Sequence, residues 1–111
     1  MRHRGAIVVA AVLLLAACSA GDRKPAVDSY RVDPAGTTLT LDVVARPGST
    51  ARAEVATQDA DRVVLKVRVR EPGGSGVDLG QHYPVTVTLA QPLGGRPVTT
   101  DYGQEITLAT P

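Results

Sequence analysis

Large aromatic side chains are scarce in this sequence, which has three tyrosines and neither phenylalanine nor tryptophan. A core built without them depends on valine, leucine and alanine, each of which buries less apolar surface than an aromatic ring does. There is one cysteine, Cys18, so an internal disulfide is excluded. The fold must therefore be stabilised by many small aliphatic contacts.

An excess of charge of one sign is also lacking. After residue 17, ten Arg and Lys residues stand against eleven Asp and Glu residues, so no strong electrostatic attraction for a nucleic acid follows. Apolar runs of roughly 20 residues, which a membrane-spanning helix needs, are absent as well. We therefore expect neither a nucleic-acid partner nor a permanent transmembrane helix.

A shorter apolar run does occur near the start of the chain. Arg2 and Arg4 precede it, residues 5–15 (GAIVVAAVLLL) are wholly apolar, and small residues surround the point where it ends. A cationic start, a short apolar stretch and small residues at a cleavage point are typical of a secretory signal peptide. The sequence thus predicts an exported protein.

The tetrapeptide Leu15-Ala16-Ala17-Cys18 resembles a bacterial lipobox. The resemblance to small bacterial lipoproteins implies that residues 1–17 are a type II signal peptide. It also implies a diacylglyceryl group on the Cys18 thiol, with or without a further N-acyl chain, and a lipid anchor on the extracytoplasmic face of the cell membrane. Ordinary cleavage after a site such as Cys18-Ser19-Ala20 would instead release a soluble secreted domain. We favour lipidation because the single cysteine stands where the lipobox needs it.

The next segment, residues 18–29, is polar, contains Pro25 and has no hydrophobic period. We interpret it as a flexible tether that holds a domain clear of the lipid head groups, although a disordered terminus without a purpose of its own has the same composition. A single domain is then expected over residues 30–111.

Those residues alternate between apolar and polar side chains with the period of a half-buried β-strand. The clearest example is residues 62–70 (RVVLKVRVR), in which valine's branched side chain suits a pleated sheet. We expect strands at residues 30–32, 37–45, 50–58, 62–70, 84–90, 98–100 and 104–109. The expected inward-facing residues are Leu39, Leu41, Val43, Val55, Val63, Leu65, Val67, Val69, Val85, Val87, Leu89, Ile106 and Leu108. Strands this short, with frequent turn signals, predict an all-β fold: a small antiparallel β-sandwich, Ig-like in the loose sense, with a small β-barrel as the alternative.

One surface feature stands above the background, a basic stripe of four residues: Arg62, Lys66, Arg68 and Arg70. Residues two apart on a strand share a face, so the stripe could bind an anionic envelope polymer, lipid head groups or an acidic patch of an envelope protein. The alternative is a solvated outer face that pairs with Glu54 and other acids on neighbouring strands. We favour that alternative because charge runs are usually solvated faces.

Residues with catalytic or metal-binding potential are few. His82, the one histidine after residue 17, follows a glycine-rich loop (residues 71–82), and Asp78 or Asp101 could orient it as a general base. The scattered carboxylates have no spacing typical of zinc or calcium ligands, and the loop lacks the Lys-Ser/Thr ending of a phosphate-binding loop. We therefore expect no enzymatic activity, no metal and no cofactor other than the lipid on Cys18.

Two hypotheses of function follow. The favoured one is a lipid-anchored cell-envelope protein whose non-catalytic domain acts as a binding or assembly module, through its loops (especially 71–82 and 91–103) or through its edge strands. The alternative is a small extracytoplasmic enzyme or metal-dependent accessory protein that uses His82.

Overall fold

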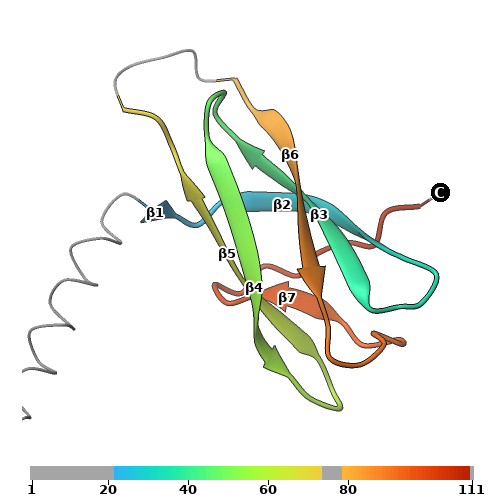
Figure 1. The fold of residues 1–111 in the computed structure, drawn as a ribbon. Helices are drawn as coiled ribbons and strands as arrows, with labels where there is room; N and C mark the ends of the chain where they lie inside the picture. The colour runs from blue at the N-terminus through green and yellow to red at the C-terminus, as the bar shows by residue number, and fades with distance from the viewer. Residues whose placement is uncertain (1–21, 74–78, 111) are drawn as a thin grey trace, which may run out of the picture.

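Residues 22–73 and 79–110 are described by a computed structural model of the chain, in which two β-sheets pack face to face (Figure 1). One sheet contains β1 (Asp22–Arg23), β4 (Thr50–Gln58), β5 (Val63–Arg70) and β7 (Val98–Thr100), in the order β1-β5-β4 with β7 also paired to β5. The other contains β2 (Ala26–Val32), β3 (Thr38–Ala45) and β6 (Gln81–Thr88), in the order β2-β3-β6. The predicted small β-sandwich is confirmed, and the described strands form two separate sheets instead of the barrel weighed as the alternative.

The core lies between the two central strands, β3 and β5. Leu39, Leu41 and Val43 on β3 and the four alternate residues Val63, Leu65, Val67 and Val69 on β5 are each at most 1% exposed. The period of two in the sequence predicted these positions correctly. Val87, Leu89 and Ile106 are also buried as expected, whereas Val55 and Val85 are half-buried at its margin. The buried hydrophobic residues of the described part that lie outside the predicted set are Val27, Tyr30, Ala45, Leu93 and Val98.

The tether predicted for residues 18–29 is wrong from residue 22 onward, and residues 18–21 lie outside the described part. Asp22 and Arg23 pair with the end of β5, and β2 begins at Ala26. The sequence pattern of this stretch does not show which residues are buried, because a β-bulge between Val27 and Ser29 shifts the register against β3. Val27 and Tyr30, three residues apart, therefore both face the core, and no period of two is visible.

The C-terminal part of the chain secures these N-terminal strands. The side-chain amide of Gln104 accepts a hydrogen bond from the Val27 N–H at 3.1 Å and donates one to the Val27 carbonyl at 2.6 Å. It thus pairs with Val27 as a neighbouring strand would. The Tyr102 hydroxyl donates to the carbonyl of Pro25, and burial raises the pKa of Tyr102 to about 12, so this donor keeps its proton at neutral pH.

The predicted last strand, residues 104–109, is not a regular strand. This segment makes one isolated bridge to β7 and another to β2, where Tyr30 bonds to the backbone of residues 107 and 109. Ile106 is buried as expected, but Leu108 is 54% exposed, so its assignment to the core is wrong. Single bridges to two different strands do not make successive side chains alternate between buried and exposed, as a continuous ladder would.

Strand β6 begins at Gln81 and ends at Thr88, whereas the sequence predicted residues 84–90. Pro84 lies within the strand, opposite Asp42 of β3. A proline interrupts no ladder here because β6 is the last strand of its sheet and its other edge has no ladder partner. Short strand β7 is at the edge of its sheet as expected, but it pairs with β5 in parallel.

The sandwich has two ends. We call the end where the described chain begins the entry end; it comprises residues 22–24, 46–49, 70–73 and 79–80. The far end comprises residues 33–37, 59–62 and 89–97, at the opposite ends of the same strands. The eight residues of β5 separate the two ends by about 25 Å.

Candidate functional site

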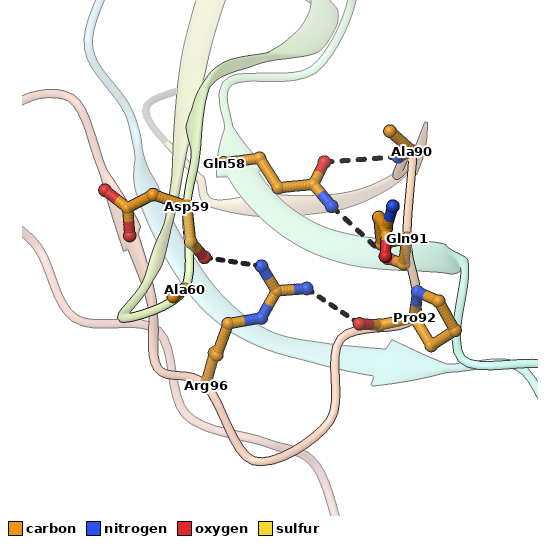
Figure 2. Close-up of a pocket in the computed structure, with 7 residues that line it drawn as sticks. All are labelled: Gln58, Asp59, Ala60, Ala90, Gln91, Pro92 and Arg96. Atoms are coloured by element: carbon orange, nitrogen blue, oxygen red, sulfur yellow. Dashed lines mark hydrogen bonds between the residues drawn. The ribbon is translucent and has the colours of Figure 1, made fainter.

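A hollow of about 500 Å³ opens at the far end of the sandwich, between the β4–β5 hairpin and the chain that leaves β6 (Figure 2). Edge strands from different sheets, β4 and β6, lead into its two walls. The lining residues are Gln58, Asp59, Ala60, Ala90, Gln91, Pro92 and Arg96.

The amide of Gln58 joins the two walls. Its Nε2 donates to the carbonyl of Gln91 at 3.3 Å, and its Oε1 accepts from the N–H of Ala90 at 3.1 Å (Figure 2). These bonds connect the end of β4 to the chain after β6, which belongs to the other sheet. The side chain therefore fixes the width of the hollow where no backbone ladder does.

Arg96 forms a second connection across the hollow. Its Nε, Nη1 and Nη2 donate to the carbonyls of Leu93, Asp59 and Pro92 at 2.9, 2.7 and 2.7 Å. In residues 22–73 and 79–110, no carboxylate oxygen lies within the 4.0 Å of an ion pair with this guanidinium. Because a guanidinium has five N–H groups, Arg96 keeps two donors and its full charge for a bound anion.

Asp59, although close in sequence to this wall, directs its carboxylate elsewhere. Its Oδ1 accepts from the N–H groups of Asp61 and Arg62 at 2.9 and 3.0 Å, as expected of a hairpin turn. These two backbone bonds hold the pKa of Asp59 below its ordinary value. The carboxylate is therefore ionised at neutral pH and its hydrogen bonds stabilise the turn, while the charge of Arg96 makes a smaller contribution to the lowered pKa without a direct ion pair.

The basic stripe lies along β5, but acids accompany it. Lys66 and Arg70 are exposed, Arg68 is half-buried, and Arg62 precedes the strand. Arg68 donates two bonds to the carboxylate of Asp101 at 2.8 and 2.7 Å. The Arg70 Nε lies 3.7 Å from Asp22, and Lys66 is opposite Glu54 in the β4–β5 register. These partners match the interpretation of a solvated, charge-balanced outer face.

The Arg68–Asp101 pair yields a prediction about pH. Arg68 holds the pKa of Asp101 below its ordinary value of 3.8, chiefly through their hydrogen bonds, so the stabilisation is complete above pH 3.8 and is lost as the pH falls through the lower folded value. At pH 7 we expect Asp101→Asn to lower the free energy of unfolding by at most about 1 kcal/mol. The melting temperatures of the variant and the unsubstituted protein should converge as the pH is lowered toward 2. A difference in melting temperature that stays constant with pH would show that the Arg68–Asp101 pair does not stabilise the fold.

His82 lies on the outer face of the other sheet. Its Nδ1 is 2.8 Å from the Oδ1 of Asp42, and both side chains are open to solvent. Asp101, expected as one of two candidates to orient His82, is bonded to Arg68 instead, while Asp78 falls in the undescribed residues 74–78. Among the described residues the His82 ring bonds to Asp42, with no recorded bond to a hydroxyl or thiol.

Two further features, a metal-binding cluster and a membrane-spanning helix, are absent from the described part of the chain. Residues 22–73 and 79–110 contain no group of three or more His, Cys, Asp and Glu side chains that could hold a metal ion. The same residues contain no helix long and apolar enough to cross a membrane. Cys18 and the lipobox lie outside the described residues.

Comparison with known proteins found no matching family model, no matching curated protein and no matching solved structure.

Proposed function

We propose that this protein is a lipid-anchored cell-envelope protein whose β-sandwich is a non-catalytic binding module, with the far-end hollow as its binding site. The supporting observation is the position of the hollow relative to the start of the described chain. The chain enters the sandwich at Asp22, four residues after Cys18, whereas the hollow lies at the other end of the strands. A lipid on Cys18 thus leaves the hollow facing away from the membrane.

The chemistry of the hollow suits a carboxylate or another anionic group on an envelope protein or polymer. Arg96 is held by three carbonyls and presents two further N–H donors, an arrangement that favours planar anions such as carboxylates. Gln58 fixes the opposite wall. Because both side chains are already immobilised, a ligand would lose little of its binding free energy to ordering them.

The test is site-specific cross-linking in the intact envelope. A photoreactive amino acid at Gln91, which lines the hollow, should capture a partner, whereas the same residue at Gln81 should not. Gln81 is a matched control because it is also an exposed glutamine, and as the first residue of β6 it lies beside the entry end instead of the far end. Equal adducts at the two positions, or none at Gln91, would contradict the assignment of the hollow.

A further inference from the structure

The distance between the lipobox cysteine and the first strand is short. Strand β1 begins at Asp22 and is hydrogen-bonded to the end of β5, so three residues separate it from Cys18 and four residue-to-residue steps lead from Cys18 to Asp22. Four fully extended residues span at most about 14 Å, while the head-group layer of one leaflet is about 5 to 8 Å thick. If Cys18 is acylated, as the proposed function requires, the entry end is held next to the membrane surface rather than clear of it.

The charges of the described residues are distributed unequally between the two ends. The entry end has four cations and two carboxylates: Arg23, Lys24, Arg46 and Arg70 with Asp22 and Glu71. The far end has two cations and three carboxylates: Arg62 and Arg96 with Asp33, Asp59 and Asp61. The end next to the lipid anchor is therefore the positive one, and an anionic membrane surface would attract it.

An exposed leucine lies at the same end. Leu79 is 64% exposed, and it lines a shallow hollow of about 210 Å³ together with Arg23, Arg46 and Glu71. The Glu71 carboxylate lies within 4 Å of both guanidinium groups, so these three side chains together retain one positive charge. Arg23 is anchored by a 2.8 Å bond to Glu71, and Lys24 beside it is exposed. An apolar side chain flanked by cations is the arrangement of surfaces that bind among lipid head groups, where the leucine is buried and the cations contact phosphates.

We propose that the entry end is a membrane-contact surface that binds the anionic head groups of phospholipids, so that the domain stands upright with its far-end hollow about 25 Å further out. This inference rests on the proposed function, because acylation of Cys18 delivers the surface to the membrane. The short connection sets the distance, the charge distribution selects the end, and Leu79 supplies the apolar contact.

The experiment measures the depth of two matched positions. Gly73 at the entry end and Gly95 at the far end both have open space for a Cβ and no positive φ, so Gly73→Cys and Gly95→Cys should fold normally. Because acylation consumes the Cys18 thiol, each acylated variant has a single thiol for a fluorophore. In vesicles of phosphatidylglycerol and phosphatidylcholine containing a head-group nitroxide lipid, we expect several-fold stronger quenching at position 73. Equal quenching at both positions would overturn the inference.

A longer connection separates head-group binding from simple tethering. With twelve Gly and Ser residues inserted between Gly21 and Asp22, position 73 should stay quenched in vesicles with phosphatidylglycerol but not in phosphatidylcholine alone. Lys24→Glu should reduce this quenching, whereas Lys66→Glu, the same change in the middle of β5, should not. Loss of quenching in both lipids after the insertion would show that the entry end has no affinity of its own.

Acylation is verified by mass on the same samples. An acylated chain whose position 73 is not quenched would overturn this inference alone. A chain that carries no acyl group would overturn the proposed function as well.

Discussion

Replacement of Leu65 by alanine is expected to lower the free energy of unfolding by about 2 to 5 kcal/mol. Leu65 is fully buried in β5, where it lies opposite Val55 of β4 and Thr100 of β7. Protein interiors are closely packed and relax only partly around a deleted side chain, so most of the contacts that Leu65 makes would not be replaced. Urea denaturation followed by circular dichroism would measure the change.

Leu108→Ala is the matched control. It removes the same atoms from a leucine that is 54% exposed, so we expect a change within about 0.5 kcal/mol. A Leu65 variant that melted within a degree of the unsubstituted protein would show that the inward phase of β5 is wrong. A large loss in the Leu108 variant would show instead that residue 108 belongs to the core.

Cys18→Ser is expected to abolish acylation completely and to release or mislocalise the domain. The resemblance to a lipobox implies that the Cys18 thiol receives the lipid, and a serine hydroxyl cannot replace it. The sequence has no second cysteine that could take over this role. Two or three acyl chains add about 0.8 kcal/mol for each buried CH₂, so their loss removes nearly all of the membrane affinity. Metabolic palmitate labelling and membrane fractionation would measure both effects.

Ser19→Ala is the neighbouring control, since it leaves the thiol in place and should keep the label. Palmitate label on the Cys18→Ser protein would defeat the lipoprotein interpretation. Loss of the label with the domain still membrane-bound, in a chain shown by mass to lack residues 1–17, would instead assign membrane binding to the protein surface alone.

The central strands were predictable because their side chains obey one simple period. In β3 and β5 every second residue is leucine or valine, apart from Ala45 at the end of β3, and both strands pair on two sides, so the alternation continues over eight residues. Prediction failed where the strand pairing is irregular or confined to one side. The bulge after Val27 breaks the period of β2. Pro84 is typical of a strand start, but it lies inside β6, which pairs with β3 along one edge. Leu108 belongs to a segment with a single bridge to β2.

The candidate site was less predictable than the fold. Gln58 and Arg96 bond to backbone carbonyls and to one backbone N–H. Because every residue has these backbone groups, the sequence pattern does not show which of them will be the partners. The one available signal was an arginine placed inside a turn rich in glycine and proline, residues 94–97. The basic stripe was found, but its pairing with Asp101 and Asp22 depends on residues distant in sequence.

The bonds between Val27 and Gln104 also constrain the order in which the protein folds. These residues are 77 positions apart, as are Pro25 and Tyr102, so the first strands acquire these partners only after residues 102–104 have been synthesised. Contacts of such separation form slowly because a long loop must close first. A chain delivered with its N-terminus first therefore lacks these bonds until residue 104 has arrived, which would suit the export that we propose.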